Sequence, residues 1–430
     1  MTSREQARAL LKNFRGDRYL CGAGVLSQAG PLARKLGTRA LLFANDGGWH
    51  ASLTAAVLES LQKAGVETVG GRAFPGARPN SPREDVYRME SLILHARPDL
   101  IIALGGGSVI DAAKAAGALA ALGLACPTMD SLFGMGKVTA LSTPARRLIP
   151  LMAIQTAAGS AAHLTRYSNI TDPEAGQKKL IIDDALVPAA ALFDFDVLRT
   201  APPSLLTDGI LDGVSHNLEV YTGCAADKLE AISQVALTGL ELLLTEGPSA
   251  VQSHAPAALE AVGLGTDLGG LAIMLGGTNG PHLNSFSFVD VVSHGRACGL
   301  LNPYYIVLFG DAIEARLRPV GSLLRKAGLI EGPLESKHGR ELALAVARGL
   351  MNFSLRLNAP ISLSQIPGFG AVHRERALKA AQDPALESKL KNMPIPMTRD
   401  DILRHMGPLL HAAFEGRLEN VPAFSASRSA

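Results

Sequence analysis

An aspartate and a histidine four residues apart, Asp212 and His216, lie in a stretch at 209–223 whose apolar residues recur at helical spacing. Four residues is slightly more than one helical turn, so both side chains leave the same face. A carboxylate oxygen beside a neutral imidazole is half of a site for a divalent metal, and imidazole suits iron, zinc and nickel. The alternative is an Asp–His hydrogen bond that supports the core. The pair alone leaves both interpretations open.

A glycine-rich turn, GGGS at 105–108, is the second chemical signal. It follows an apolar run at 99–104 and leads directly into a helical pattern. Glycines allow the backbone to approach a bulky anion, and the first N–H groups of the helix favour negative charge. The pyrophosphate of a dinucleotide fits such a turn. The GxGxxG fingerprint is absent, however, and a simple strand-to-helix turn is the alternative.

Two further segments carry polar side chains of interest. A loop at 156–160, TAAGS, follows an apolar run at 149–155, and its small, hydroxyl-bearing residues leave room for a planar ring. Downstream, His282 and His294 lie beside glycine and proline turns. Neither histidine would stand out alone, and we assign the remaining histidines mostly to satisfied surface or core positions.

The elements that must position these residues fall into two halves. Short apolar runs alternate with helical patterns over the first half, which predicts βαβ units and a parallel sheet. The expected strands are 39–44, 66–74, 99–104, 149–155 and 190–195. A helix is expected to begin with Ser81 as N-cap and Pro82 at its first position. Beyond residue 201, long apolar-periodic segments predict helices. We therefore expect an α/β nucleotide-binding domain at 1–200 and an all-α metal-binding domain at 201–430.

Composition narrows the class of protein. The chain has 430 residues, 47% of them hydrophobic, and a net charge of +2 without a basic block. This argues against nucleic acid or a membrane surface as the main partner. Four scattered cysteines indicate reduced thiols in a cytoplasmic protein. The N-terminus has no signal-like apolar run, and the longest apolar run, at 115–125, is too short to span a bilayer.

The order of four features resembles one known family. They are GGGSVIDAAK, the TAAGS loop, the D-x-x-x-H pair, and two later histidines of which the second is followed by glycine. This order resembles the iron-containing (group III) alcohol dehydrogenases, which have the dehydroquinate synthase-like fold. The resemblance runs from CGAGVL, beginning at Cys21, to NPYY, beginning at Asn302.

The resemblance implies roles for particular residues. The metal ligands would be Asp212, His216, His282 and His294. The pyrophosphate would lie on Gly106, Gly107 and Ser108. The nicotinamide and its ribose would lie along Thr156, Ser160 and Lys179. Asn45 or Asp46 would meet the adenosine ribose, with Asn80 nearby. An acidic group there favours NAD over NADP, because it bonds the 2′-hydroxyl and repels a 2′-phosphate.

The implied activity is metal-dependent hydride transfer between NAD(P) and a small alcohol or its aldehyde or ketone. Fe²⁺ is the expected metal, with Zn²⁺ or another divalent ion as alternatives, and the metal would act as a Lewis acid. No catalytic residue beyond the ligands is identified. A homodimer or larger homo-oligomer is expected by analogy. A small substrate would bind beside apolar residues such as Phe286 and Phe288.

Three positions depart from the family's usual pattern. Many relatives have a histidine four residues after the third ligand, where this chain has Phe286. Ala157 replaces the second threonine of the usual TTAGT loop, and His163 replaces a frequent glutamate. These changes concern the proton path and the substrate more than the metal.

Rival functions remain open at this point. A polyol dehydrogenase, a hydroxyacid–oxoacid transhydrogenase or a dehydroquinate synthase-like lyase would use the same sites. A lyase or a phosphorylated substrate should need clustered lysines and arginines, and the sequence near the ligands offers only Arg296. A nucleotide-binding protein without catalysis would be expected to have lost metal ligands.

Overall fold

The computed structural model describes residues 1–45 and 47–424. Contacts divide the chain into two compact units. One consists of Leu11–Pro202, and the other combines Met1–Leu10 with the chain from Pro203 onward. No pattern in the sequence predicted that the first ten residues belong with the second unit. That the units fold as separate domains stays a prediction.

The first unit is built on a parallel sheet, as expected. Its strand order is β1-β10-β7-β5-β2-β3, with β4 also pairing with β2. The strands are β1 (Tyr19–Gly22), β2 (Arg39–Ala44), β3 (Glu67–Thr68), β4 (Phe74–Pro75), β5 (Leu100–Gly105), β7 (Leu151–Gln155) and β10 (Ala190–Asp194). Every residue of β5 is buried. This explains why the strand is apolar throughout and does not alternate, since both faces of such a sheet are covered.

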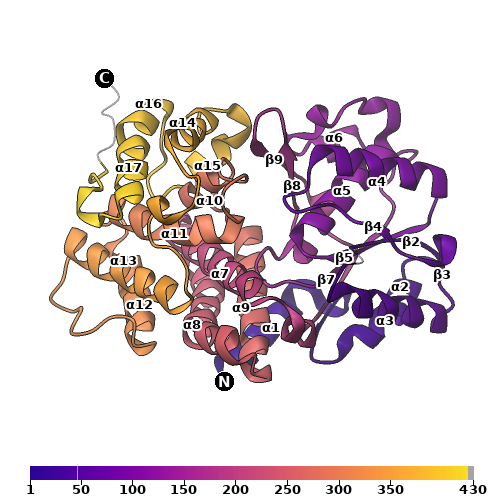
Figure 1. The fold of residues 1–430 in the computed structure, drawn as a ribbon, viewed down its shortest axis with the longest axis horizontal. Helices are drawn as coiled ribbons and strands as arrows, with labels where there is room; N and C mark the ends of the chain where they lie inside the picture. Colours follow the sequence, from indigo (N-terminus) through magenta and orange to yellow (C-terminus); the bar gives the residue numbers. More distant parts are fainter. Residues whose placement is uncertain (46, 425–430) are drawn as a thin grey trace. The chain divides into compact units, whose positions relative to one another are not determined.

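Helices cover both faces of this sheet (Figure 1). They are α2 (Ala29–Arg34) and α3 (His50–Lys63) on one face, and α4 (Arg83–Ala96) and α5 (Gly107–Leu122) on the other. Each face has its own apolar core, because alternate residues of a strand point to opposite faces. In β5, Ile101 packs into one core and Ile102 into the other.

A smaller sheet accompanies the parallel one. It joins β6 (Gly134–Met135), β8 (Tyr167–Asp172) and β9 (Gln177–Ile182), and α6 (Lys137–Leu141) follows β6. Strands β8 and β9 pair antiparallel along their whole length.

Two local predictions were wrong. The strand expected at 66–74 is two short strands, because Gly70 and Gly71 turn the chain with φ of 65° and 64°. Ser81 does not cap α4, whose N-cap residue is Pro82. Instead, Ser81 has a φ of 51°, and its hydroxyl donates to the carbonyl oxygen of Ser108 at 2.9 Å.

The second unit is helical from Pro203 on, which confirms the expected fold class. Its helices are α7 (Pro203–Gly223), α8 (Leu229–Ser253), α9 (Pro256–Leu275), α10 (Gly280–Ser285), α11 (His294–Leu308), α12 (Glu314–Lys326), α13 (Gly339–Arg356), α14 (Ala371–Ala380), α15 (Glu387–Lys391), α16 (Arg399–Asp401) and α17 (Gly407–Glu415). The N-terminal part of α1 (Ser3–Arg15) joins this unit, where Arg4 pairs with Glu246 at 3.0 Å.

Helix α7 lies at the centre of the helical unit and packs against α8, α9 and α11 (Figure 1). Small residues allow close contact between these helices. A Cβ added to Gly213 would lie 2.7 Å from the Thr266 side chain, and one added to Gly269 would lie 3.0 Å from Cβ of His216. The backbone of α9 therefore lies directly against the part of α7 that carries His216.

Two helices are long and apolar enough to cross a membrane by length and composition alone, at Gly107–Ala125 and Pro256–Leu275. The sequence had suggested no apolar run of that length. In the apolar segments of these two helices, 67% and 83% of the residues are buried inside the protein, which is typical of core helices.

A buried lysine ties α5 to the segment that precedes β8. The Lys114 ammonium donates to the carbonyl oxygens of Thr165 at 2.8 Å and Tyr167 at 2.7 Å, and lies 3.8 Å from the Asp111 carboxylate. Asp111 itself accepts two hydrogen bonds from Asn169. Asp111 thus connects α5 to β8. Burial lowers the pKa of Lys114 to about 8, against the opposing effect of Asp111.

Replacing this lysine (Lys114→Met) should destabilise the protein by about 3 kcal/mol or more, because it leaves a buried carboxylate without its cation. The wild type should also gain stability relative to the variant as pH rises from about 8 to about 10. Over that range the folded lysine has lost its proton while the unfolded one keeps it. Urea unfolding of both proteins at pH 8.0 and 9.5 measures the effect. A wild-type advantage that shrinks with rising pH would contradict it.

Candidate active site

Helix α7 presents three ionisable side chains on one face: Asp212, His216 and Glu219. Their spacing of four and then three residues places them one above another along the helix. All three are buried, with exposed fractions of 5%, 5% and 2%. A buried ionisable group must be paired or ligated, so this face of α7 needs partners from other elements.

The first partner comes from the short helix α10, which carries His282. Asn279 caps this helix by accepting from the backbone N–H of Gly280 at 2.7 Å. The backbone N–H of Asn279 donates to Glu219 at 2.8 Å, and its side chain donates to the Glu219 carbonyl oxygen at 3.0 Å. The loop before α10 is thus fixed directly on α7, which brings His282 to the acidic face.

The second partner is His294, the first residue of α11, and Gly295 explains how it comes so close. A Cβ added to Gly295 would lie 2.1 Å from the Asp208 carbonyl oxygen and 2.7 Å from Cβ of Asp212. No side chain fits between the two helices there. The His-Gly pair seen in the sequence therefore has a steric basis, since glycine lets the start of α11 rest on the backbone of α7.

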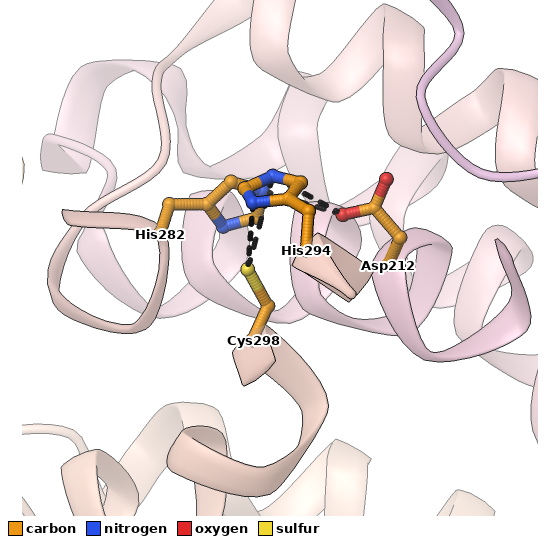
Figure 2. A group of neighbouring side chains, drawn as sticks. All are labelled: Asp212, His282, His294 and Cys298. Carbon is orange, nitrogen blue, oxygen red and sulfur yellow. Dashed lines mark hydrogen bonds and ion pairs between the residues drawn. The ribbon is translucent and has the colours of Figure 1, made fainter. Parts of the chain in front are cut away.

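The four predicted ligands do come together, around one carboxylate oxygen. Oδ1 of Asp212 lies 3.6 Å from Nε2 of His282, 3.7 Å from Nε2 of His294 and 3.9 Å from Nε2 of His216. These separations are too long for hydrogen bonds. The rings of His216 and His282 stack with their centroids 4.7 Å apart. Figure 2 shows Asp212 facing His294 and His282 across a small gap.

The residues present fit a divalent cation. Oδ1 of Asp212 and Nε2 of His282 are buried without a hydrogen-bond partner, which is costly unless something else satisfies them. Around a tetrahedral cation with bonds of 2.0–2.2 Å, neighbouring ligand atoms stand about 3.4 Å apart. The separations around Asp212 exceed this by a few tenths of an ångström. One ion would satisfy both atoms with small side-chain movements.

Glu219 holds His282 in the orientation that a ligand needs. Its Oε1 accepts from Nδ1 of His282 at 2.7 Å, so the lone pair of Nε2 is directed towards Asp212. A carboxylate behind a ligating histidine fixes the tautomer and raises the basicity of the ring. The sequence contained this signal at the third position of the α7 face, but our sequence analysis missed it.

The protonation states of Asp212 and His216 suit a metal, whereas His282 must first lose a proton, because Cys298, Glu219 and Asp212 raise its pKa well above the usual value against the effect of burial. Burial lowers the pKa of His216 to about 4, against the opposing effect of Asp212, so this imidazole is neutral at pH 7. Burial alone would raise the pKa of Asp212, but the imidazoles, His216 foremost, hold it well below its usual range. A charged carboxylate and a neutral imidazole are the forms that bind cations.

Two further residues at the site were missed from the sequence. Cys298, one turn after His294 on α11, is fully buried, and its Sγ lies 3.9 Å from Nε2 of His294 (Figure 2). Lys389, on α15, donates to the Thr278 hydroxyl, and its ammonium lies 5.6 Å from the ring centroid of Phe286. The spacing to His294 could have revealed Cys298, whereas nothing in the sequence connects Lys389 with the ligands.

The structure also shows which residues surround the positions that differ from the family pattern. Phe286 stacks on His294 at 5.6 Å with an interplanar angle of 16°. His163 is a core residue between Tyr19 and Phe193. Phe288, expected beside the substrate, is fully buried against Phe369. That expectation is wrong for Phe288, because a completely buried ring offers no surface to a ligand.

Arg296 is held in an ion pair with Asp208 at 2.8 Å, at one side of a pocket of about 580 Å³ within the helical unit. The pocket reaches Ser293, the residue before His294. Half of its lining residues are apolar: Val291, Val292, Ala359, Pro360, Ile366 and Pro367.

In the α/β unit, the glycine turn opens α5 at the end of β5. Gly106 is the N-cap residue, so the N–H groups of Gly107 and Ser108 belong to the first turn, where a helix has no internal partners for them. A Cβ added to Gly107 would lie 2.8 Å from Oγ of Ser160. The turn and the TAAGS loop are therefore neighbours. Only glycine at 107 leaves space between them.

Hydrogen bonds order the surroundings of this turn. The backbone N–H of Asn80 donates to Oγ of Ser108 at 3.0 Å, which brings the 78–82 loop to the start of α5. The backbone N–H of Thr156 donates to the carbonyl oxygen of Gly105 at 3.1 Å, while its buried hydroxyl has no hydrogen-bond partner. A buried hydroxyl beside a glycine turn suits an added ligand.

Two other residues expected to bind the cofactor, Lys179 and Asp46, do not lie at this turn as free groups or cannot be placed there. The Lys179 ammonium forms an ion pair with Asp172 at 2.7 Å, and so is already engaged within the small sheet. Asp46, expected at the adenosine ribose, lies outside the described residues. Its neighbour Asn45 donates to the carbonyl oxygen of Ala77 at 3.2 Å, which ties down the end of β2.

Comparison with known proteins identifies relatives of the chain. Residues 16–195 match the model of a family described as iron-containing alcohol dehydrogenase. The chain is 31% identical to a probable alcohol dehydrogenase, EutG, of Salmonella typhimurium over 71% of this chain and 75% of that protein. It is 26% identical to an NAD-dependent methanol dehydrogenase of Bacillus methanolicus over 67% and 73% of the two chains.

Solved structures share the fold. An alcohol dehydrogenase from Oenococcus oeni superposes with a TM-score of 0.76 at 23% identity, covering 92% of this chain and 97% of that one. The α/β unit followed by a helical unit is thus a known arrangement.

Enlarging Gly295 should damage the site through its backbone. We expect Gly295→Ala to lower the affinity for a divalent cation about 10–100-fold, because α11 must move away from α7 and take His294 with it. Isothermal titration with Zn²⁺ measures this. Gly407→Ala is the matched control, since its added Cβ would find its nearest neighbour 3.9 Å away. Equal affinity in both variants would show that the close approach does not position His294.

Proposed function

The chain belongs to the iron-containing alcohol dehydrogenase family, and we propose from this premise that Asp212, His216, His282 and His294 hold its catalytic metal. The protein is an enzyme, an NAD(P)-linked oxidoreductase that interconverts an alcohol and its aldehyde or ketone. We propose that the physiological substrate is small.

One observation carries the assignment of the metal site. Three imidazole nitrogens from α7, α10 and α11 surround a single buried carboxylate oxygen at 3.6–3.9 Å without forming a hydrogen bond to it. An Asp–His hydrogen bond that merely supports the core would be shorter. The geometry therefore favours ligation over that alternative.

The roles of the chain follow from this arrangement. When bound, a divalent metal supplies a Lewis acid for the substrate oxygen and the dinucleotide exchanges the hydride with carbon. Asp212 lowers the charge of the site, and Glu219 keeps the proton of His282 on Nδ1. Phe286 covers one face of His294 with an apolar ring and limits the access of water.

A divalent metal and NAD(H) are the cofactors that the family implies, and we propose Fe²⁺ and NAD as the specific choices. NAD over NADP is supported by the acidic Asp46 that follows β2, a position that disfavours a 2′-phosphate. For the pyrophosphate we propose Gly106, Gly107 and Ser108, with Asn80 beside them. Thr156, Ser160 and Lys179 are proposed along the nicotinamide and ribose, which requires Lys179 to give up part of its pairing with Asp172.

The proton path must differ from a histidine relay at position 286, because a phenylalanine cannot carry a proton. We propose that the substrate proton leaves through water or a ribose hydroxyl. Lys389 lies behind Phe286, and burial lowers the pKa of its ammonium to about 8. It places a positive charge near the site.

We further propose a homodimer or larger homo-oligomer in the cytoplasm. The free state of all four cysteines is in keeping with a reducing compartment.

Removing the central carboxylate tests the metal site. Asp212→Asn should lose bound divalent metal and reduce turnover about a hundredfold or more, while NADH still binds. The protein is purified anaerobically, its metal measured, and alcohols and aldehydes screened with NAD(H) and NADP(H). Asp227→Asn, at an exposed position, is the control. A wild type without bound divalent metal, or an Asp212→Asn variant that keeps its metal, would contradict the proposal.

Filling the glycine turn tests the dinucleotide site separately. Gly107→Ala should raise the dissociation constant for NADH about tenfold, because the new methyl group occupies the space beside Ser160 that a pyrophosphate needs. Metal content should not change. Fluorescence titration of NADH measures the affinity, with Gly117→Ala on the same helix as control. If both variants bind NADH equally well, the pyrophosphate lies elsewhere.

A further inference from the structure

Cys298 lies one helical turn after His294 on α11, so both side chains leave the same face of that helix. The cysteine is fully buried. None of the ligand positions implied by the family pattern includes it. Its surroundings nevertheless distinguish it from an ordinary core cysteine.

The thiol belongs to a compact group of possible ligand atoms. One atom from each of Asp212, His282, His294 and Cys298 lies within 4.8 Å of all the others (Figure 2). Sγ is 3.9 Å from Nε2 of His294, whereas sulfur and nitrogen atoms around a tetrahedral cation stand about 3.6 Å apart. Sγ is also 4.0 Å from Nδ1 of the same ring. A rotation of the His294 or Cys298 side chain must therefore accompany ligation.

A second observation, independent of the cysteine, points to a ligand at this place. Oδ1 of Asp212 and Nε2 of His282 are each in side chains more than 90% buried and have no hydrogen-bond partner. Both atoms face the gap that the thiol borders (Figure 2). A cation there would satisfy all three groups at once.

We propose that Cys298 is a ligand of the metal, as a thiolate, together with Asp212, His282 and His294. The inference rests on the proposed metal site and changes its chemical character from nitrogen and oxygen alone to nitrogen, oxygen and sulfur. The thiol transfers its proton to solvent as the sulfur–metal bond forms. A soft thiolate favours a thiophilic cation such as Zn²⁺ or Co²⁺.

With sulfur in the set, Cys298 takes the fourth ligand position, which the proposed function gives to His216. Nε2 of His216 lies 3.9 Å from Oδ1 of Asp212, but His216 is not part of the compact group that includes the sulfur. The common ligands are Asp212, His282 and His294. Whether sulfur joins them is a question that spectroscopy answers directly.

Cobalt provides the test, because a thiolate bound to Co²⁺ gives a charge-transfer absorption in the near ultraviolet that nitrogen and oxygen ligands do not give. The full-length protein is freed of metal with a chelator and loaded with one equivalent of Co²⁺. The wild type should show the band. Cys298→Ser should bind Co²⁺ without it, and Cys126→Ser, which changes another buried free cysteine, should retain it.

Metal preference gives a second measurement. Cys298→Ser should lower the affinity for Zn²⁺ about tenfold or more while changing the affinity for Mn²⁺, a harder ion, much less. If the variant does not fold, X-ray absorption at the zinc edge of the wild-type protein still decides, because a sulfur ligand lies at about 2.3 Å and nitrogen or oxygen ligands nearer 2.0–2.1 Å.

The outcomes separate this inference from the proposed function. Stoichiometric Co²⁺ with no charge-transfer band, or a zinc site without sulfur, overturns the role of Cys298 and leaves the metal site intact. A wild type that binds neither Co²⁺ nor Zn²⁺ overturns both. A band that disappears in Cys298→Ser but persists in Cys126→Ser supports the thiolate ligand.

Discussion

The helical unit must stabilise a single buried carboxylate, that of Asp212. A charged oxygen taken out of water costs several kcal/mol unless positive charge or donors replace the solvent. Here Oδ1 has no hydrogen-bond partner but has three imidazole nitrogens within 3.9 Å. Helices that bring imidazoles to a carboxylate without bonding to it keep space for a cation. Without a cation, the unpaired carboxylate destabilises the folded protein. A bound cation removes this penalty, and the free energy regained adds to the affinity for the cation.

Close helix packing makes the arrangement possible. Gly295 lets the start of α11 rest against the backbone of α7, and Gly269 does the same for α9 beside His216. In each case a methyl group would meet backbone or Cβ atoms, which cannot move aside as the end of a flexible side chain can. Main-chain contacts thus fix the positions of the helix backbones that carry the proposed ligands, so that only side chains need to move when a cation binds.

The sequence predicted the site unevenly, and the reasons are physical. Asp212 and His216 are detectable because one helix carries both, and the same logic would have found Glu219 and Cys298 at three- and four-residue spacing. His282 and His294 lie on two other helices, α10 and α11, so only the resemblance to a family identified them. Lys389 reaches the site from a helix about a hundred residues later, which no local pattern reveals.

The fold was predictable to a similar degree. Long apolar runs marked the central strands of the sheet, where burial on both faces leaves no ambiguity. Predictions failed where glycine or serine took a positive φ, as at Gly70, Gly71 and Ser81, because those residues turn the chain without changing its apolar pattern. Met1–Leu10 joins the helical unit through contacts such as the Arg4–Glu246 ion pair, between residues too far apart in sequence to be recognised as partners.

Charge balance connects the residues that the sequence did not reveal. Asp212 and Glu219 contribute two negative charges, and Lys389 contributes one positive charge, for which Glu219 and Cys298 are the stabilising neighbours. A divalent cation would leave this buried group with a net charge of +1. A thiolate at Cys298 brings the total to zero, the state that a poorly solvated interior tolerates best. The charges of the buried lysine and the buried cysteine therefore depend on each other. Either charge alone would destabilise the buried cluster, whereas both together with the cation leave it neutral.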